Sequence, residues 1–224
     1  MKVALIIPAL DEESAIGALL DGVARNIVRH VIVGDNGSRD GTAEVARGRG
    51  ATVVHVAERG YGAACAGALE KLPADTEIVL FMDADGSDDP AEIPRLLAPI
   101  EKGEADLVIG SRKHVERGAL TPQQRFGNWL ATRLIAAIYH HRYTDLGPFR
   151  AIRRELLDRI GMRDRRYGWT VEMQIRALQV GARVVEVPVT YRKRIGKSKI
   201  SGTVSGVVKA GWWIVYTIAK YAWR

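Results

Sequence analysis

Short, almost entirely apolar runs recur through the first 110 residues, and stretches with a helical pattern separate them. A strand can be apolar at nearly every position only where helices cover both of its faces. Strands that alternate with helices at this spacing predict βαβ units and a parallel sheet. The expected strands are Val3–Ile7, Val31–Gly34, Thr52–Val56, Ile78–Met82 and Leu107–Ile109, and the expected helices cover residues 12–25, 42–48, 61–71 and 90–101.

Beyond residue 110 the pattern becomes less regular. The expected elements there are helices over 125–139, 169–180 and about 203–223, an extended segment over 143–150 and a strand over 183–191. Pro188 lies inside that strand and lacks a backbone N–H, which places the strand at an edge of the sheet. Residues 192–202 are rich in glycine, serine and cations, and we expect them to form a loop.

The composition excludes several classes of protein. The 224 residues are 47% apolar and 26% charged, which is typical of globular domains and not of disordered chains. Cys65 is the single cysteine, so an intrachain disulfide and a cysteine zinc cluster are excluded. The apolar start of the chain stops at Pro8 without a small-residue cleavage site, which favours a strand over a signal peptide. No run of 18 apolar residues predicts a membrane-spanning helix.

The charges are divided unevenly along the chain. Residues 1–110 carry 10 Lys and Arg against 19 Asp and Glu, whereas residues 111–224 carry 23 against 7. The first half is therefore suited to cations or metal-bound ligands, and the second half to an anion or an anionic surface. Nucleic acid, phosphorylated substrates and acidic lipid all satisfy the second condition.

Acidic residues gather where the predicted strands end. Ligands of an open α/β sheet bind outside the carboxyl ends of its strands, and Asp83 and Asp85 directly follow the fourth strand. Two carboxylates at one point can hold Mg²⁺ or Mn²⁺, which bind through carboxylates together with substrate phosphates. Taken alone, Asp85 could instead form a turn and cap with Asp89, but its place at a strand end favours the metal.

Two common nucleotide-binding motifs are absent. The loop after the first strand lacks G-x-G-x-x-G, and the chain holds no G-x-x-x-x-G-K-[ST], so a dinucleotide fingerprint and a P-loop are excluded. Asp35 and Asn36, after the second strand, could bind a base or a ribose, or could form only the turn before the next helix.

Five segments together resemble family 2 glycosyltransferases, in particular the dolichyl-phosphate mannose and glucose synthases. They are Pro8-Ala9-Leu10-Asp11-Glu12, Asp35-Asn36-Gly37-Ser38-Arg39-Asp40-Gly41-Thr42, Asp83-Ala84-Asp85, Gly110-Ser111-Arg112 and Arg194-Ile195-Gly196-Lys197-Ser198-Lys199. Each is weak alone, but all five follow the family's order, from residue 3 to about residue 202. Asp11 stands where the family usually has Asn, Asn36 replaces the second Asp of a pair, and Arg194 lies one residue closer to Gly196 than usual.

The resemblance implies a glycosyltransferase A-type fold, an α/β architecture with a mostly parallel central sheet, helices on both faces and a C-terminal interfacial helix. It also implies a nucleotide-sugar donor, Mg²⁺ or Mn²⁺, and inversion at the anomeric carbon. By matched position, the nucleotide-binding residues would be Pro8, Leu10, Asp11, Glu12, Asp35, Asn36, Asp83, Ala84 and Arg112. Asp83 and Asp85 would bind the metal, and Arg192, Arg194, Ser198 and Lys199 would bind the acceptor phosphate.

The chemistry of the acceptor decides whether a general base is needed. A phosphate monoester is ionised near neutral pH and needs no strong base, whereas a sugar hydroxyl normally does. Five cations between Arg192 and Lys199 favour the anionic acceptor, although such a run can also be a solvated surface. The expected catalytic residues are Asp85 and, where a base is used, Asp145 and Glu172; Glu172 could instead only stabilise a helix N-terminus.

The last predicted helix is rich in aromatic residues that favour a membrane interface. They are Trp212, Trp213, Tyr216, Tyr221 and Trp223. Ten uncharged residues separate Lys209 from Lys220, too few to cross a bilayer. We expect this helix to lie on an anionic membrane surface, and the alternative is packing on the core or on a second copy of the chain.

The leading hypothesis is a cytoplasmic transferase, bound peripherally to the inner face of the membrane, that moves a hexose from a GDP- or UDP-linked sugar to a polyprenyl phosphate. Its catalytic domain would span 1–202, with a nucleotide-binding half, 1–110, an acceptor half, 111–202, and an amphipathic helix, 203–224, after it. A second hypothesis keeps the donor but uses a soluble or glycolipid acceptor. A third makes residues 111–224 a non-enzymatic binder of nucleic acid or anionic surfaces. The leading hypothesis involves no nucleic acid and allows a homodimer.

Overall fold

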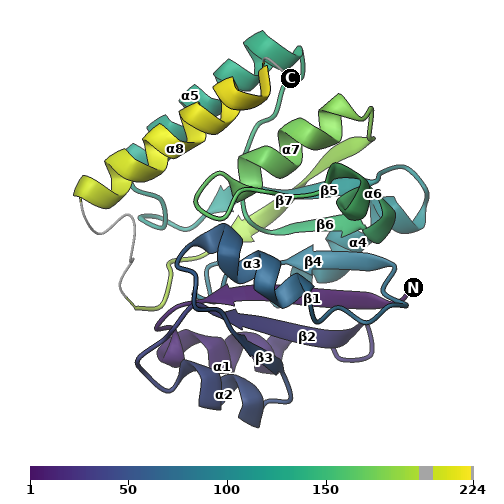
Figure 1. Cartoon of the computed structure of the whole chain (residues 1–224), viewed down its shortest axis with the longest axis vertical. Coiled ribbons are helices and arrows are strands. Elements are labelled where there is room, and N and C mark those ends of the chain that lie inside the picture. Colours follow the sequence, from purple (N-terminus) through teal and green to yellow (C-terminus); the bar gives the residue numbers. More distant parts are fainter. Residues whose placement is uncertain (197–203, 223–224) are drawn as a thin grey trace.

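One seven-stranded sheet forms the centre of the molecule, with the strand order β3-β2-β1-β4-β6-β5-β7 (Figure 1). The structure, a computed structural model, describes residues 1–196 and 204–222. The strands are β1 Val3–Ala9, β2 Val28–Asp35, β3 Thr52–His55, β4 Ile78–Phe81, β5 Leu107–Val115, β6 Arg150–Arg153 and β7 Val184–Tyr191. β6 runs antiparallel to its neighbours β4 and β5, and the other neighbouring strands are parallel. The predicted α/β fold with a mostly parallel sheet is therefore confirmed.

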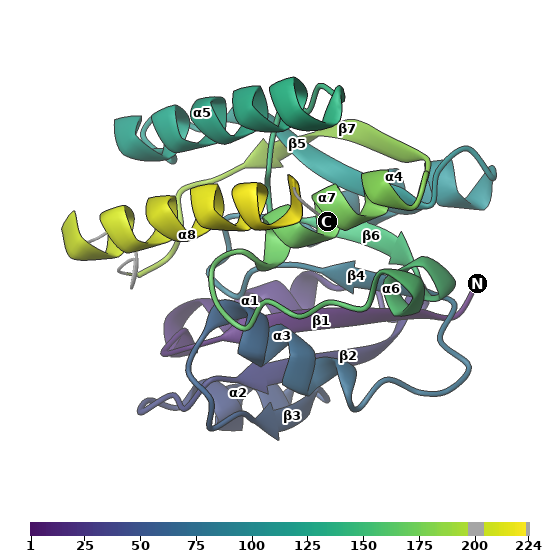
Figure 2. The same ribbon diagram turned by 45° about the horizontal axis from the view of Figure 1, so that its top comes forward.

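Helices cover both faces of the sheet and form three layers with it (Figure 2). They are α1 Glu13–Gly22, α2 Thr42–Gly48, α3 Tyr61–Leu69, α4 Ile93–Glu101, α5 Pro122–Tyr139, α6 Arg154–Ile160, α7 Trp169–Gln179 and α8 Val204–Ala222, with a 3₁₀ turn at Pro90–Glu92. One hydrophobic cluster joins α1, α2 and α4 to one face of the sheet. A second cluster joins α3, α5, α6, α7 and α8 to the other face.

β1 shows how the sequence pattern produces these layers. All seven of its residues are buried. Leu5 and Ile7 enter the first cluster and Ile6 enters the second, because neighbouring side chains of a strand point to opposite faces. A strand between two helical layers must be apolar on both faces, which explains the continuous apolar run.

The sequence does not predict β6 or α6. Residues 143–150 are expected to be extended, but β6 begins only at Arg150, and α6 follows it directly. The sequence Arg150-Ala151-Ile152-Arg153 has too few apolar residues to indicate a strand. It becomes one because β4 and β5 pair with it on both sides. Strand formation here depends on distant partners, which local sequence does not reveal.

Pro188 lies in β7, as predicted, and β7 is the last strand in the sheet order. It pairs along one edge with β5. The edge position inferred from the missing N–H of this proline is therefore confirmed.

α5 begins at Pro122, earlier than the predicted start at residue 125. A capping box explains the difference. Thr121 Oγ1 accepts the backbone N–H of Gln124 at 3.2 Å, and Gln124 Oε1 accepts the N–H of Thr121 at 2.9 Å. The proline at the first helical position is also favourable, because no intrahelical partner exists there for an N–H.

α8 packs against the rest of the domain, and it lies beside α5 in both views (Figures 1 and 2). Ile218 and Tyr221 are 1% and 4% exposed and belong to the second hydrophobic cluster. The Tyr139 hydroxyl of α5 donates to the carbonyl oxygen of Ile218 at 3.0 Å. This part of α8 therefore packs on the core, while Trp212 and Tyr216 remain exposed. Among the described helices, none is long and apolar enough to cross a membrane.

Candidate active site

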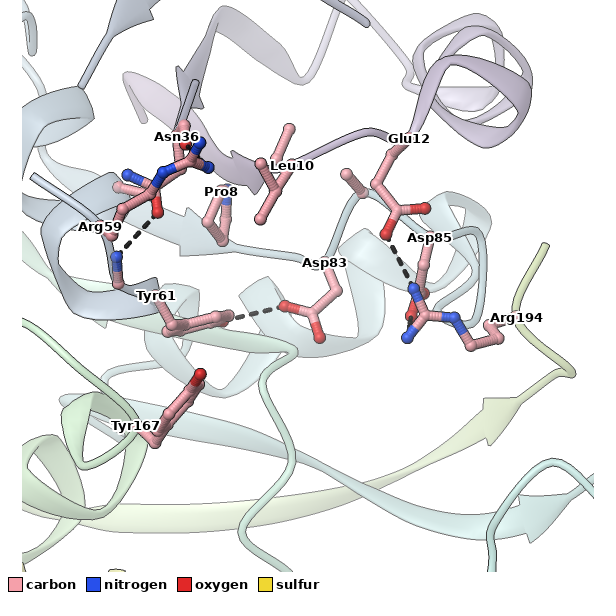
Figure 3. Close-up of a pocket in the computed structure, with 14 residues that line it drawn as sticks. Pro8, Leu10, Glu12, Asn36, Arg59, Tyr61, Asp83, Asp85, Tyr167 and Arg194 are labelled. Atoms are coloured by element: carbon pink, nitrogen blue, oxygen red, sulfur yellow. Dashed lines mark hydrogen bonds and ion pairs between the residues drawn. The ribbon is translucent and has the colours of Figure 1, made fainter. Parts of the chain in front are cut away.

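A pocket of about 270 Å³ opens where β1, β2 and β4 end (Figure 3). The loops after these strands meet there because parallel strands present their carboxyl ends at one edge of the sheet. Eight of the residues assigned from sequence line the pocket: Pro8, Leu10, Glu12, Asn36, Asp83, Ala84, Asp85 and Arg194. Arg194 comes from the segment after β7, and the others come from the strand ends.

Asp83 lies between Tyr61 and the side chains of Asp85 and Arg194 (Figure 3). The Tyr61 hydroxyl donates to Asp83 Oδ1 at 2.9 Å. The carboxyl keeps partial contact with water, but the protein packed around it, followed by the negative charge of Asp85, raises the pKa of Asp83 to about 7. The two carboxylates repel each other, and a cation bound to both would offset that repulsion.

Arg194 places a positive charge beside these carboxylates. Its Nη2 donates to Glu12 Oε1 at 2.8 Å, and its Nη1 lies 3.5 Å from Asp85 Oδ2. Asp85 Oδ1 accepts the backbone N–H and the hydroxyl of Ser87 at 2.9 and 2.6 Å. Arg194 thus joins the segment after β7 to the loops after β1 and β4, and its guanidinium is of the kind that binds phosphates.

Asp88 adds a third carboxyl group in the loop after β4. It is 2% exposed, and neither of its oxygens has a hydrogen-bond partner among the residues that the structure describes. Burial, together with the charges of Asp83 and Asp85, raises the pKa of its carboxyl well above the ordinary range. In the described part of the chain, no three His, Cys, Asp or Glu side chains are grouped to hold a metal by themselves. Asp83 and Asp85 therefore fit a Mg²⁺ or Mn²⁺ site that the phosphate oxygens of a ligand complete.

Asn36 holds the loop after β3 in place. Its Nδ2 donates to the carbonyl oxygens of Val56 and Glu58, at 3.2 and 2.6 Å. Its Oδ1 accepts the backbone N–H of Gly60 at 2.8 Å. The side-chain amide is thus engaged with backbone groups on both its nitrogen and its oxygen. In this structure Asn36 lines the pocket, and its direct contact with a base stays a prediction.

Asp11 and Asp35, also assigned to the nucleotide, are not among the residues that line the pocket. Asp11 has a φ of 51°, a conformation that Asp tolerates better than most residues. It accepts the backbone N–H of Arg39 at 2.7 Å, and its own N–H donates to Ser38 Oγ at 2.9 Å. Asp35 accepts the N–H of Ser38 at 3.1 Å. The contacts of Asp11 tie the loops after β1 and β2 together, and the bond from Ser38 to Asp35 lies within the turn after β2. Binding of a base or a ribose by Asp35 stays a prediction.

Arg112 and Asp145 form an ion pair whose side chains are only 14% and 7% exposed. Arg112 Nε donates to Asp145 Oδ2 at 2.7 Å, and Nη2 donates to Oδ1 at 2.5 Å. The guanidinium of Arg112 lies 5.2 Å from the centre of the Tyr191 ring, and Tyr191 forms a β-bridge with Asp88 in the loop after β4. Arg112 itself does not line the pocket. Both carboxylate oxygens of Asp145 accept hydrogen bonds from Arg112, which favours a role in orienting Arg112 over that of a general base.

Glu172 is fully buried and holds the loop before α7. Its carboxylate accepts the backbone N–H groups of Arg163 and Asp164 and the hydroxyl of Tyr221. Glu172 does not line the pocket, and the structure does not bring it together with Asp83 and Asp85. These contacts favour a structural role over that of a general base.

The basic segment after β7 is only partly described. Arg192 is exposed and forms an ion pair with Asp89 at the 3₁₀ turn. Ser198 and Lys199, assigned to the acceptor phosphate, lie outside the described residues. Arg194 is therefore the member of this predicted set that the structure places in the pocket.

Six further residues that line the pocket were not assigned from sequence: Ala9, Arg59, Gly60, Tyr61, Ala64 and Tyr167. Arg59 and Tyr61 follow β3, so the rule that ligands bind at strand ends could have found them. Tyr167 belongs to the loop between α6 and α7. Backbone contacts hold that loop against α3, where the N–H of Gly62 donates to the carbonyl oxygen of Arg166 at 3.0 Å. No local signal marks Tyr167, because its position depends on this distant contact.

Comparison with known proteins gives the family. The sequence matches the glycosyl transferase family 2 model over residues 4–161. An uncharacterized glycosyltransferase of Mycobacterium tuberculosis is 38% identical over 209 residues, which cover 93% of this chain and 94% of the relative. An undecaprenyl-phosphate mannosyltransferase of Micrococcus luteus is 35% identical over 231 residues, which cover 92% of this chain and 90% of the relative.

A solved structure shares the fold. It is the crystal structure of glucosyl-3-phosphoglycerate synthase from Mycobacterium tuberculosis in complex with Mn²⁺, uridine diphosphate and phosphoglyceric acid. The TM-score is 0.79 at 23% identity, and the alignment covers 99% of this chain and 78% of that chain. Because the family model matches more than half of the sequence and the relatives align along nearly all of it, this chain belongs to glycosyl transferase family 2.

Proposed function

We propose that this chain is an inverting hexosyltransferase that moves a sugar from a nucleotide-linked donor to the phosphate of a polyprenyl lipid. The observation that carries the proposal is the pocket in which Glu12, from the loop after β1, and Asp83 and Asp85, from the loop after β4, meet Arg194. Membership of the family makes the chain a glycosyltransferase. The name of the Micrococcus luteus relative supports a polyprenyl phosphate as the acceptor.

The pocket combines the groups that a nucleotide sugar requires. Pro8 and Leu10 provide an apolar wall against which a base and ribose can lie, and Tyr61 and Tyr167 provide aromatic side chains. Arg194 provides a guanidinium for the diphosphate. We infer that the base lies toward β1 and β2 and the diphosphate toward β4.

Asp83 and Asp85 would hold the divalent cation, Mg²⁺ or Mn²⁺. When bound, the cation would neutralise charge on the diphosphate leaving group. Arg194 contributes a second positive charge in the same place, since it already lies against Asp85 and Glu12. Arg194 alone does not neutralise the carboxylates of Glu12, Asp83 and Asp85, and the bound cation would supply the remaining positive charge.

The transfer is a direct displacement. An oxygen of the acceptor phosphate bonds to the anomeric carbon while the bond from that carbon to the diphosphate oxygen breaks. The electron pair of the broken bond leaves with the nucleoside diphosphate. Attack opposite the leaving group inverts the anomeric carbon. A phosphate dianion has no proton to lose, so no general base is required, and Asp145 serves to orient Arg112 toward the acceptor phosphate.

The membrane proposal rests on α5 and α8. Phe126 and Trp129 of α5 are 62% and 52% exposed, and Trp212 and Tyr216 of α8 are 68% and 45% exposed. Large aromatic side chains of this kind favour the interface between a bilayer and water. We infer that this helix pair contacts the cytoplasmic face of the membrane, where a polyprenyl phosphate would present its headgroup.

A thermal-shift screen tests the donor site. GDP- and UDP-linked sugars are added with and without Mn²⁺, and the cognate donor is expected to raise the unfolding temperature only when Mn²⁺ is present. Asp85→Ala should abolish this shift. Asp158→Ala, which removes a surface carboxylate paired with Arg154, is the matched control and should leave the shift intact. A metal-dependent shift that survives Asp85→Ala would contradict the proposed site.

Transfer itself is tested with a radiolabelled donor and undecaprenyl phosphate in detergent. Label is expected to move into the organic phase on extraction. If the label stays in the aqueous phase with every lipid phosphate and is transferred to a soluble acceptor, the acceptor is soluble and the proposed lipid acceptor is wrong. The proposed donor site would not be affected by that result.

A further inference from the structure

The α6–α7 loop, residues 161–168, contributes Tyr167 to the wall of the active-site pocket (Figure 3). The loop runs between α3 and α8 and contacts both helices (Figure 2). A side chain carried by a loop is placed only as precisely as the contacts that hold the loop, because a loop lacks the regular backbone bonds of a helix or strand. The position of the Tyr167 ring therefore depends on what holds residues 161–168 in place.

Backbone contacts with the start of α3 hold one side of the loop. The N–H of Gly62 donates to the carbonyl oxygen of Arg166 at 3.0 Å. A Cβ atom added to Gly60 would lie 2.1 Å from the carbonyl oxygen of Arg165, so the two backbones touch with no room for a side chain between them. These contacts fix how closely the loop approaches α3. The side of the loop that faces α8 is held by different groups.

Asp164 organises the backbone that carries Tyr167. It is 8% exposed, and its Oδ1 accepts the N–H groups of Arg166 and Gly168 at 2.7 and 3.1 Å. These two residues precede and follow Tyr167 in the chain, so one carboxylate oxygen fixes the backbone on both sides of the ring. The other oxygen, Oδ2, accepts the indole N–H of Trp213 in α8 at 2.6 Å. The orientation of this carboxylate therefore depends on a donor that lies 49 residues away in the sequence.

Glu172, in the first turn of α7, holds an earlier part of the same loop. It is fully buried, and its Oε2 accepts the N–H groups of Arg163 and Asp164 at 3.1 and 2.6 Å. The Tyr221 hydroxyl of α8 donates to its Oε1. Trp213 and Tyr221 are about two helical turns apart, at about 3.6 residues per turn, so both lie on the same face of α8. This face thus supplies a donor to each of the two carboxylates that bond the loop backbone.

We propose that Trp213 and Tyr221 of α8 are positioning residues of the active site, which act through the α6–α7 loop to fix Tyr167 in the pocket. This rests on the proposed function, since the place of Tyr167 affects binding only if the pocket holds the nucleotide sugar. Packing of α8 alone requires no polar donor, because Ile218 of the same helix packs through apolar contacts. Both donors instead end on carboxylates that already bond the loop backbone, so each restricts the loop as well as the helix.

The effect is measured as the affinity of the full chain for a nucleotide sugar in the presence of Mn²⁺. GDP-mannose, GDP-glucose, UDP-glucose and UDP-galactose are titrated calorimetrically into the wild type, and the one that binds most tightly is the probe. Trp213→Phe and Tyr221→Phe each remove one donor group and keep an aromatic ring. Each is expected to raise the Kd of the probe at least about fivefold, because a bond to a carboxylate that holds the loop is lost. Tyr139→Phe, which removes a hydroxyl bonded to the same helix at Ile218, should leave the Kd unchanged.

A double-mutant cycle distinguishes positioning from a general loss of stability. Tyr167→Ala removes the ring on which Trp213 is proposed to act. In this background, Trp213→Phe is expected to change the Kd by less than about twofold, because substitutions of residues that act through one another are not additive. A substitution that only destabilised the protein would raise the Kd by the same factor with and without the ring. Circular dichroism shows whether each variant is folded, and Tyr221→Phe replaces Trp213→Phe in the cycle if the latter is not.

The outcomes separate these positioning roles from the proposed function. If the wild type binds none of the nucleotide sugars with Mn²⁺, the proposed function and the positioning roles are both wrong. If the wild type binds the probe and both phenylalanine variants bind it equally well, the positioning roles alone are wrong. The same conclusion follows if Trp213→Phe raises the Kd equally with and without the Tyr167 ring, or if Tyr139→Phe loses as much affinity.

Discussion

Arg150 and Glu172 are the two charged residues with 0% exposure in the described part of the protein. Arg150 differs from Glu172 in the partners that it finds. It has no carboxylate partner among the described residues. Its Nη1 donates to the carbonyl oxygen of Thr170 at 2.9 Å, and its Nη2 donates to that of Gly147. Its Nε has no partner. The guanidinium thus joins the start of α7 to the segment before β6.

Arg150→Lys should destabilise the protein by about 2–4 kcal/mol. One ammonium group cannot reach both carbonyl oxygens that the forked guanidinium bonds, and it is a more strongly hydrated charge to bury. Urea unfolding followed by circular dichroism measures the difference. Arg47→Lys, at an exposed pair with Glu44, should change the free energy of unfolding by less than about 0.5 kcal/mol. If both substitutions change the free energy of unfolding equally, the two hydrogen bonds of the Arg150 guanidinium do not contribute measurably to stability.

Tyr61 positions Asp83 and should affect donor binding through it. Tyr61→Phe removes the hydroxyl that donates to Asp83 Oδ1 and leaves the ring in place. Because a bond to a charged acceptor is worth about 1.5–3 kcal/mol, we expect the Kd of the nucleotide sugar with Mn²⁺ to rise at least about tenfold. Calorimetric titration measures it. Tyr139→Phe, which removes a hydroxyl bonded to α8, should leave the Kd unchanged. An unchanged Kd in Tyr61→Phe would mean that Asp83 needs no such support.

The sequence predicts the part of the site that lies on strand ends. Pro8, Asp83 and Asp85 could be placed because parallel strands end at one edge of a sheet, whatever the exact packing. Tyr167 could not, since its loop reaches the pocket through backbone contacts with α3. The neighbours of Glu172 were equally hidden, because Tyr221, which bonds its carboxylate, lies far away in the sequence.

At the scale of elements, the same distinction holds for the sheet. β1 and β4 are recognisable from their own residues, because both are buried on two faces and are apolar throughout. β6 is a strand only through its pairing with β4 and β5. The start of α5 was recognisable in principle, since a capping box is a local pattern, but helical periodicity alone placed it too late.

The starts of β5 and β7 are tied by one ion pair, which predicts a pH dependence of stability. Arg183 Nη2 lies 2.8 Å from Asp106 Oδ1, and its hydrogen bonds to the carboxyl lower the pKa of Asp106. A carboxyl whose pKa is lower in the folded state stabilises the fold above its unfolded pKa, and this stabilisation is lost as the pH falls through the folded pKa. Asp106→Asn should therefore lower the free energy of unfolding at pH 7, and the difference from wild type should shrink below about pH 4. Urea unfolding at several pH values measures it; a difference that is constant with pH would exclude the charge as its cause.

The exposed faces of α5 and α8 predict membrane binding. Trp129 of α5 and Tyr216 of α8 are exposed. Replacing both with alanine should reduce binding to vesicles of anionic lipid several-fold, because both side chains are of the interfacial kind. Vesicle sedimentation measures the bound fraction. Val180→Ala, at an exposed apolar side chain of the loop after α7, is the control and should bind as the wild type does. Full binding by the double variant would remove this helix pair from the membrane proposal.

At the scale of the whole molecule, the acidic and the basic halves of the sequence meet at one site. Asp83 and Asp85 belong to the acidic first 110 residues, and Arg194 belongs to the basic remainder. The pocket brings both sets together, since Arg194 reaches the carboxylates of Glu12 and Asp85. The uneven composition that predicted separate tasks for the two halves therefore describes the two sides of a single site.

Deletion of residues 204–224 tests whether α8 is an appendage or part of this single unit. Ile218 and Tyr221 complete the second hydrophobic cluster, and Trp213 Nε1 donates to Asp164 Oδ2 at 2.6 Å, in the loop that carries Tyr167. We expect the deletion to lower the midpoint of thermal unfolding by about 5–10 °C, since two large buried side chains are lost. The alanine double variant at Trp129 and Tyr216 keeps this packing and should unfold near the wild-type temperature. A deleted protein with an unchanged midpoint and an unchanged donor shift would make α8 a separate attachment, as the division at residue 202 supposes. If the deletion lowers the midpoint and removes the donor shift, the truncated protein is destabilised as a whole. Membrane binding must then be tested with surface variants that leave the packing of α8 intact.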